Sequence, residues 1–192
     1  MYKWLLPVLA FLIILGGCAS GEERSPLETS IYNSENDKIG TATFKERPEG
    51  VEVALKVEGV EPGIHAVHIH EFPKCEAPDF KSAGNHFNPM DKEHGLMNTK
   101  GAHTGDMANV EADGSGMIDV KLVLSEAKLK EAQQSLLRKE GTSIVLSSGV
   151  DDGMSQPSGN SGERIACGKI TLKADEDDTT DPTEPDKEQE ES

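Results

Sequence analysis

The stretch HAVHIHEF, residues 65–72, places three histidines in six positions of a segment that otherwise reads as a β-strand. Side chains alternate between the two faces of a strand, so His68 and His70 are expected to share one face. His65 falls on the opposite face, where we expect a structural histidine that is hydrogen-bonded within the fold. Two imidazoles on one face of a rigid strand form half of a metal site. This stretch therefore predicts a β-fold with a metal centre.

The other histidines support the same prediction. All six histidines of the chain lie between positions 65 and 103. The segment 71–109 is rich in Gly, Pro, Asn, His and Met, and long loops inside compact domains are usually functional. This loop offers four further ligands, His86, His94, His103 and Asp106. Imidazoles together with one carboxylate suit Zn²⁺, Cu²⁺ or Fe²⁺, so the spacing predicts a metal without naming it.

The rest of the chain reads mainly as short strands. In VEVALKVE, residues 51–58, apolar side chains alternate with charged ones, which is typical of a half-buried strand. Similar patterns occupy residues 39–45, 64–70, 117–124, 143–146 and 165–172. Turns rich in Gly, Pro and Asp separate several of them, and no repeating strand–helix units occur. The pattern predicts an all-β fold, an antiparallel sandwich or barrel.

Two segments depart from this regular order. Ser125 can cap the N-terminus of a short helix whose apolar residues share one face, namely Leu129, Ala132, Leu136 and Leu137. Residues 147–164 form a second long loop, which we also expect to be functional.

The N-terminus has the pattern of a bacterial lipoprotein leader. An apolar run at 4–15 is too short to span a bilayer as a helix but suits a signal peptide. It ends in LGGC, residues 15–18, which resembles a lipobox. We expect a signal peptide at 1–17, a lipid on Cys18, and a polar tether at 18–30. The domain would then lie at the outer face of the bacterial cell membrane; a plain secretory signal or an uncleaved anchor is the alternative.

Charge is concentrated at the C-terminus. Ten acidic residues and one lysine give residues 174–192 a net charge of −9, and the remaining −7 of the total of −16 lies in the rest of the chain. We expect an ordered domain at 31–173, followed by a disordered acidic tail. The sequence has no basic face of the kind that binds nucleic acid, so we expect no nucleic-acid partner.

The cysteines fit an oxidising compartment. If Cys18 carries a lipid, Cys75 and Cys167 remain. An even remainder outside the cytoplasm predicts one disulfide, and two free buried thiols are the alternative.

Four motifs together resemble the copper/zinc superoxide dismutase family over residues 30–173. They are HAVHIHEF, SAGNHFNP at 82–89, GDMANV at 105–110, and GNSGERIACG at 159–168. The resemblance implies a Greek-key β-fold, copper and zinc as cofactors, and superoxide as the substrate. It leaves the choice between a monomer and a homodimer open.

The resemblance also implies a role for each matching residue. His68 and His70 correspond to copper ligands, and His86 to the imidazolate that bridges copper and zinc. The remaining zinc ligands correspond to His94, His103 and Asp106. Three further roles are implied: a disulfide between Cys75 and Cys167, an arginine that orients superoxide at Arg164, and a carboxylate that hydrogen-bonds ligands of both metals at Asp151.

The chain departs from the family at one copper ligand. Ser147 stands where the family has a fourth copper histidine, and no histidine follows His103. Cu²⁺ prefers four ligands in a tetragonal arrangement, whereas Cu⁺ accepts fewer, so the loss should weaken copper binding and penalise Cu²⁺ more. Three functions stay open: a dismutase with reduced activity, a redox-inactive zinc-binding protein, or a copper carrier. A carrier could use the soft sulfur ligands of Met90, Met97, Met107 and Met154, for which loop packing is the alternative.

Overall fold

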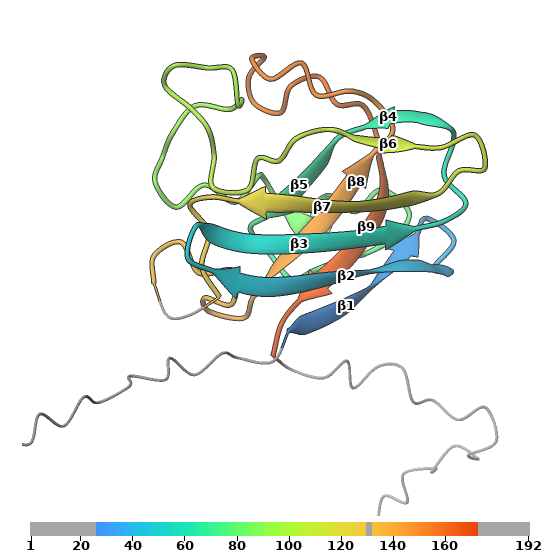
Figure 1. The fold of residues 1–192 in the computed structure, drawn as a ribbon, viewed down its shortest axis with the longest axis horizontal. Helices are drawn as coiled ribbons and strands as arrows, with labels where there is room; N and C mark the ends of the chain where they lie inside the picture. The colour runs from blue at the N-terminus through green and yellow to red at the C-terminus, as the bar shows by residue number, and fades with distance from the viewer. Residues whose placement is uncertain (1–25, 130–131, 173–192) are drawn as a thin grey trace, which may run out of the picture.

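The computed structural model describes residues 26–129 and 132–172, which form an all-β domain (Figure 1). The strands follow in the order β1 (Leu27–Asn33), β2 (Lys38–Arg47), β3 (Gly50–Val57), β4 (Gly63–His65), β5 (Val67–His70), β6 (Val110–Ala112), β7 (Ile118–Leu124), β8 (Thr142–Ser147) and β9 (Arg164–Ile170). Within these ranges the one helical element is a 3₁₀ helix, η1 (Lys81–Ala83). The expected all-β class is confirmed.

Seven strands form one antiparallel sheet in the order β5-β8-β9-β1-β2-β3-β7, and β4 pairs separately with β6. β4 continues into β5 after Ala66, and β6 leads through a turn into β7. The short β4–β6 ladder therefore joins the two edges of the large sheet. The sheet curls so that β2, β3 and β7 lie across β5, β8 and β9 (Figure 1). This curled arrangement agrees with a Greek-key barrel, and loop residues pair with the outer edge of β5.

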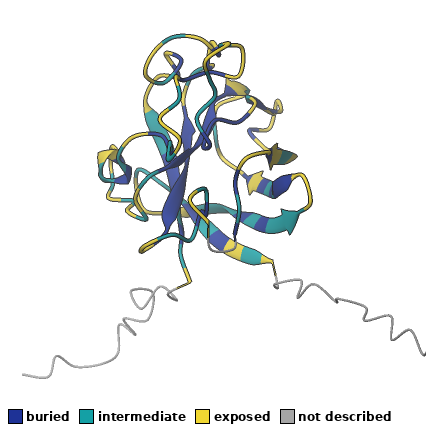
Figure 2. Ribbon diagram, turned by 90° about the vertical axis from the view of Figure 1, so that its left-hand side faces the viewer, coloured by how far each residue is buried: buried dark blue, intermediate teal, exposed yellow. Residues whose placement is uncertain are grey.

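The interior follows from the alternating pattern of the strands. In β3, the alternate residues from Val51 to Val57 are buried, whereas Lys56 is exposed. The same core includes the fully buried Phe44 and Ile118 from the neighbouring strands β2 and β7. Buried residues are concentrated along the strands (Figure 2). The apolar face of the curled sheet thus packs against itself.

The strands differ from the expected pattern in three places. β1 begins at Leu27, so the sheet includes four residues that the sequence pattern assigns to the tether. The expected strand at 64–70 is interrupted at Ala66, because its first part pairs with β6 and its second part with β8. β6 itself is three residues long, which is too short to produce a recognisable period in the sequence.

The short helix expected from Ser125 is wrong for the described residues of that segment, which form turns. Leu129 and Leu136 are nevertheless buried in the core, so their apolar pattern reports burial correctly. The backbone instead makes ladder-like hydrogen bonds, with Lys128 N–H donating to Gln134 O at 3.0 Å and Leu136 N–H to Lys128 O at 2.8 Å. A helix of about 12 residues is marginal on its own, so such tertiary contacts can override it.

A disulfide joins Cys75, in the loop after β5, to Cys167 in β9, with 5.6 Å between the Cα atoms. The expected disulfide is therefore confirmed. No helix in the described part of the chain is both long and apolar enough to cross a membrane. The expected leader at 1–17, the lipid on Cys18 and the acidic tail lie outside the described residues.

The disulfide should be a large contributor to stability, because it closes a loop with a sequence separation of 92 residues. Replacing both Cys75 and Cys167 by Ala should lower the free energy of unfolding by about 4–5 kcal/mol, the loop-closure entropy expected for a loop of this length. Urea unfolding of the metal-free protein, followed by circular dichroism, measures this change. An unaltered unfolding midpoint would contradict the expectation.

Candidate metal centre

The backbone of β5 brings the metal-ligand candidates together. One edge of β5 pairs with β8, and its other edge pairs with loop residues. Ile69 N–H donates to Gly105 O at 2.9 Å, and Phe87 N–H donates to Ile69 O at 2.8 Å. These bonds place Asp106 opposite His68 and His86 opposite His70 as isolated bridges. Candidates up to 38 positions apart in the sequence thus meet at a single strand.

The carboxylate of Asp106 is the point where three histidines converge. Its Oδ1 lies 2.9 Å from His86 Nδ1 and 3.3 Å from His103 Nδ1, and its Oδ2 lies 3.1 Å from His94 Nδ1. Backbone N–H groups of Gly95 and His103 also donate to Oδ2, at 2.9 and 3.0 Å. This carboxylate is therefore held in one orientation from several sides.

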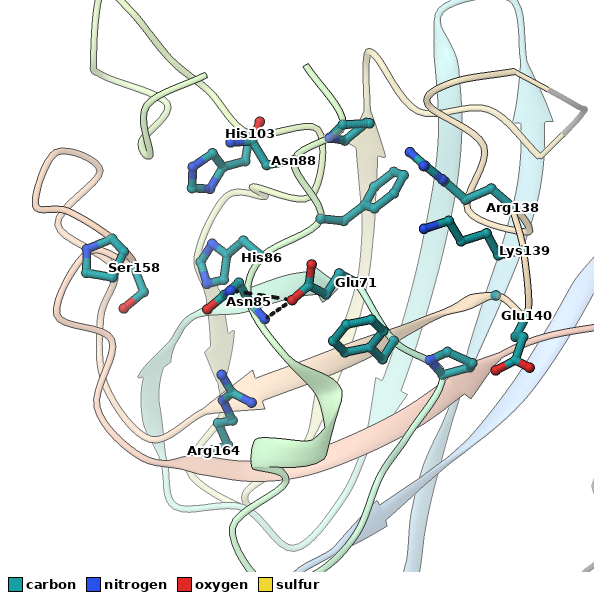
Figure 3. Close-up of a pocket in the computed structure, with 16 residues that line it drawn as sticks. Glu71, Asn85, His86, Asn88, His103, Arg138, Lys139, Glu140, Ser158 and Arg164 are labelled. Atoms are coloured by element: carbon teal, nitrogen blue, oxygen red, sulfur yellow. Dashed lines mark hydrogen bonds between the residues drawn. The ribbon is translucent and has the colours of Figure 1, made fainter. Parts of the chain in front are cut away.

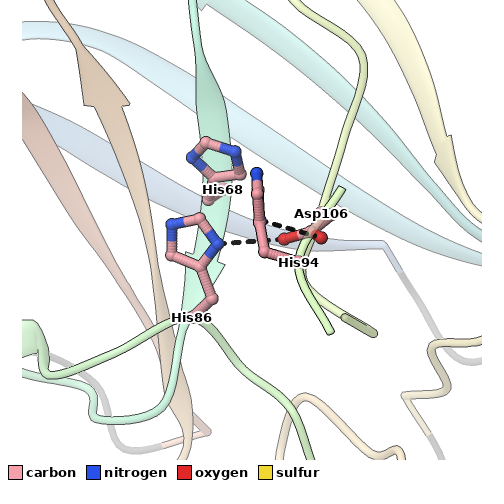
Figure 4. A group of neighbouring side chains, drawn as sticks. All are labelled: His68, His86, His94 and Asp106. Carbon is pink, nitrogen blue, oxygen red and sulfur yellow. Dashed lines mark hydrogen bonds and ion pairs between the residues drawn. The ribbon is translucent and has the colours of Figure 1, made fainter. Parts of the chain in front are cut away.

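One group of donors is especially compact. Ligand atoms of His68, His86, His94 and Asp106 all lie within 4.8 Å of one another, and all four residues are buried (Figure 4). The ring of His86 is central: its centroid lies 3.9 Å from that of His68, 5.0 Å from His70 and 5.6 Å from His103. The six predicted ligands therefore form one continuous cluster around His86.

The carboxylate of Asp151 accepts hydrogen bonds from two of these histidines. Its Oδ2 accepts a hydrogen bond from His68 Nε2 at 2.8 Å, and its Oδ1 accepts one from His94 Nε2 at 3.1 Å. Such partners fix the tautomer and orientation of an imidazole, leaving the other ring nitrogen free for a metal. Gly159 packs so closely that a Cβ there would overlap the Asp151 carboxylate, which explains the glycine in the motif.

Within residues 26–129 and 132–172, three buried side-chain nitrogens have no hydrogen-bond partner: the Nδ1 atoms of His68, His94 and His103. Burying a polar group without a hydrogen-bond partner costs free energy, so such groups are rare in native structures and often mark a missing ion or water. All three nitrogens belong to the cluster, and two of them face Asp106. Their neutral lone pairs are the form in which imidazole binds a metal ion, so the donor set fits zinc with copper.

The electrostatics of the cluster keep the ligands ready for a metal. Burial lowers the pKa of His70 to about 2 and that of His86 to about 4, so both rings stay neutral. Burial by itself would raise the pKa of Asp106, but its close contacts with the imidazoles of His103, His86 and His94 outweigh burial and hold this pKa far below its usual value. The pKa of Asp151 is lowered in the same way, with hydrogen bonds from His68, Gly153 and His94 outweighing burial.

Arg164 stands beside the cluster at the start of β9. Its Nη1 donates to Phe80 O at 2.7 Å and its Nη2 to Gly84 O at 2.8 Å. The same Gly84 carbonyl accepts a hydrogen bond from His70 Nδ1 at 3.0 Å. One backbone oxygen thus orients both Arg164 and His70.

Ser147 lies on β8, and His65 lies on β4. Ser147 ends β8 opposite Arg164 and is buried. His65 places Nδ1 2.9 Å from Ser147 O and Nε2 2.7 Å from Glu61 O, so both of its ring nitrogens are occupied by backbone carbonyls. This confirms the expected structural role of His65.

Two residues that support the site were not predicted. Asn109 makes a reciprocal pair with Asp151: its amide donates to Asp151 O at 2.9 Å, and Asp151 N–H donates to its side-chain oxygen at 2.9 Å. Gln156 clamps the backbone of His94 through bonds of 2.8 and 2.9 Å. Asn109 lies within the quoted motif GDMANV, which is the one signal that could have indicated it.

The methionines divide into two groups. Met107 is buried and packs in the hydrophobic core, which agrees with a packing role. Met90, Met97 and Met154 are exposed on the loops. Met97 lies against Gly153 on the second loop, which agrees with a packing role.

A groove with a volume of about 810 Å³ opens beside the cluster. His86, His103 and Arg164 line one end of it, and Arg138, Lys139 and Glu140 line the other (Figure 3). Small anions can reach the vicinity of Arg164 through this opening.

The fold and the site together define a metalloprotein: a closed antiparallel barrel with a buried cluster of histidines and one aspartate. The family model for copper/zinc superoxide dismutase matches residues 38–170. The chain belongs to the copper/zinc superoxide dismutase family.

Known relatives cover most of the chain. It is 44% identical to superoxide dismutase [Cu-Zn] 1 of Aquifex aeolicus over 142 residues, which is 73% of this chain and 84% of that protein. It is 42% identical to superoxide dismutase [Cu-Zn] 2 of the same organism over 170 residues, 88% of this chain and 99% of that protein. A similar solved structure is a histidine-substituted double mutant of a superoxide dismutase-like protein from Bacillus subtilis. It is 37% identical, has a TM-score of 0.74, and aligns over 75% of this chain and 96% of that one.

The stability of the metal-free protein should fall in acid, between pH 6.5 and about 4. The pKa of His86 is lowered from 6.5 to about 4 in the folded state, so the unfolded chain binds its proton first. The free energy of unfolding is therefore highest above pH 6.5 and decreases as the pH falls, by roughly 1.4 kcal/mol for each pH unit and each such histidine. His94, whose pKa is raised by Asp106 and Asp151 against the effect of burial, partly opposes this trend.

Urea titrations of chelator-treated protein at several pH values measure this slope. His86→Gln, which removes the titrating ring, should give a flatter profile over the same range. A wild-type stability that is constant or rises toward pH 4 would show that these histidines do not stay neutral.

Asp151 should control metal affinity without contacting the metals. In Asp151→Asn, one of the two imidazole N–H groups faces an amide N–H in place of a carboxylate oxygen, so His68 or His94 loses its orientation. Metal retention in a chelator competition should fall about 10–100-fold. The matched control is Asp152→Asn, since Asp152 is exposed and its carboxylate bonds only within its own loop. Equal losses of metal retention in both variants would show that Asp151 has no special role in metal affinity.

Proposed function

We propose that this protein is an extracytoplasmic superoxide dismutase of the copper/zinc family whose copper is held more weakly than its zinc. The observation that carries the proposal is that five candidate ligands surround His86, beside an Arg164 that two backbone carbonyls orient and that pairs with Ser147. The five are His68, His70, His94, His103 and Asp106. The reaction would convert two superoxide ions and two protons into oxygen and hydrogen peroxide.

The zinc side of the centre has a complete ligand set. We assign zinc to His86, His94, His103 and Asp106. Three imidazoles and one carboxylate give the four ligands that a structural zinc site prefers. The Nδ1 atoms of all three histidines lie within 3.3 Å of the Asp106 carboxylate, which supports this assignment. Zinc would tie the loop 71–109 to the barrel.

The copper side has three imidazoles, from His68, His70 and His86. The orphaned Nδ1 of His68 supports a metal on its side of the cluster. His70 uses Nδ1 to donate to Gly84, which leaves its Nε2 for a metal. Copper, when bound, supplies the one-electron exchange with superoxide. Ser147 offers a hydroxyl where a fourth imidazole would stand, so we expect weaker retention of copper, of Cu²⁺ above all.

Arg164 would hold the superoxide anion. Its guanidinium is fixed by two backbone carbonyls and lines the groove beside His86. A fixed cation at the mouth of a partly buried site attracts an anion and orients it. His70 shares the Gly84 carbonyl with Arg164, so the anion would be held next to the copper ligands.

We further propose that a lipid on Cys18 anchors the protein at the outer face of the bacterial cell membrane. The apolar run at 4–15 and the LGGC pattern before Cys18 support this location. The Cys75–Cys167 disulfide is consistent with an oxidising compartment. Association as a homodimer stays a prediction.

The serine at position 147, where a fourth copper histidine is expected, favours a second candidate function: a redox-inactive protein stabilised by zinc. In that case the barrel keeps zinc and loses copper without losing its fold. A copper carrier is the third candidate, for which the exposed Met90, Met97 and Met154 could assist.

Ser147→His separates these candidates. The substitution restores a fourth imidazole and should increase both copper retention after dialysis and dismutase activity, each by about tenfold or more, the scale of a metal-site change. Metal content is measured by mass spectrometry and activity by a superoxide assay with free-copper controls. The matched control is Ser148→His, because Ser148 is exposed at the next position. It adds the same residue without completing the site.

The outcomes distinguish the candidates. A wild-type protein that binds zinc but no copper, and that gains both copper and activity in Ser147→His, is a zinc-stabilised protein that has lost its enzymatic function. A wild type that holds Cu⁺ far more tightly than Cu²⁺ and has no activity is a carrier. If Ser147→His and Ser148→His behave alike, position 147 has no special role in copper binding.

A further inference from the structure

The groove beside the metal centre is larger than superoxide requires. It has a volume of about 810 Å³ and extends from His86 and His103 to the loop that precedes β8. Its lining includes the rings of Phe72 and Phe87 as well as charged groups (Figure 3). A diatomic anion would fill a small part of this space, so the groove can hold a longer, extended occupant.

Three cations line this groove: Arg138, Lys139 and Arg164. None of them forms an ion pair within 4.0 Å with any carboxylate of residues 26–129 and 132–172. Arg138 is held by a hydrogen bond to Gln133 O at 3.1 Å, with its guanidinium 5.9 Å from the centre of the Phe87 ring. Arg164 donates only to backbone carbonyls. These cations keep their charge available for an external anion.

Two carboxylates, Glu71 and Glu140, also line the groove, which leaves one excess positive charge. Glu71 is directed inward by hydrogen bonds from the backbone and side chain of Asn85, at 3.1 and 3.4 Å. The groove is therefore a locally positive surface on a chain with a total charge of −16. An acidic, extended segment is complementary to it.

The chain itself places such a segment next to the groove. β9 ends at Ile170, which pairs with Thr142 directly after the groove residue Gly141. Gly141 and Ile170 are in contact, since a Cβ on Gly141 would overlap Ile170 O. β9 therefore ends beside the end of the groove that carries Lys139, and the acidic segment 174–192 begins four residues after Ile170 in the sequence. Its 19 residues can span about 60 Å when extended, more than any path along the groove.

We propose that the acidic segment 174–192 docks in this groove of its own chain, with its carboxylates on Lys139, Arg138 and Arg164. Exposed ion pairs are individually weak and are screened by salt, so the contact is reversible. Only three residues separate β9 from the segment in the sequence, so docking would be intramolecular, with an effective concentration on the order of millimolar.

Zero-length crosslinking of the full chain with a carbodiimide tests the docking, because it joins a lysine amine to a carboxylate only when the two are in contact. Lys121 is the matched reference: it is exposed on β7, at the sheet edge opposite β5 and β8. In the monomer fraction at low salt, links from Lys139 to 174–192 should exceed links from Lys121 by at least about fivefold. Raising the salt to 0.5 M, where the Debye length is about 4 Å, should remove most of this excess.

Two variants refine the test. Arg138→Gln keeps the Lys139 amine but removes a neighbouring charge, and should lower the yield at Lys139 severalfold; Lys121→Gln should leave this yield unchanged. If Arg138→Gln fails to fold, as judged by thermal melting, the salt series of the wild type decides. Equal yields at Lys139 and Lys121, or yields that do not respond to salt, would overturn the proposal. Links that form only between chains, seen by mixing isotopically labelled and unlabelled protein, would overturn it as well.

Discussion

The buried carboxylate of Asp106 is the interaction on which the functional part of the structure depends. It accepts contacts from three imidazoles and two backbone N–H groups, at distances between 2.9 and 3.3 Å. Such a charge is tolerated in the interior only because these donors surround it. The same contacts draw the loop 71–109 onto β5. Loop conformation and ligand position are therefore set by a single group.

Asp151 extends this arrangement to the second loop. It joins His68 on the barrel to His94 on the first loop, and Asn109 holds its backbone through two hydrogen bonds. Gln156 adds a further connection to the backbone of His94. The two loops that carry the site thus form one hydrogen-bonded unit above the sheet (Figure 1). Ser147 takes part in none of these bonds.

Much of the fold could be predicted, because the period of the strands is a local property of the sequence. Residues 51–58 show it clearly, and the structure places β3 there. The apolar pattern after Ser125 was misleading, because turns bury Leu129 and Leu136 as well as a helix would. The site candidates were recognisable by residue type, since histidines and a carboxylate are rarely gathered by chance. Asn109 and Gln156 were not, because amides that bind backbone groups over 42 and 62 positions leave no sequence period.

The carbonyl of Gly84 has a mechanical consequence. It is the common acceptor for His70 and Arg164, so the imidazole proposed to bind copper and the guanidinium proposed to bind superoxide are coupled through one peptide unit. Gly84 follows η1, and the disulfide at Cys75 ties the same loop to β9. The spacing between the imidazole and the guanidinium therefore does not depend on either side chain alone. Any displacement of the Gly84 carbonyl would therefore disturb the orientation of both side chains at once.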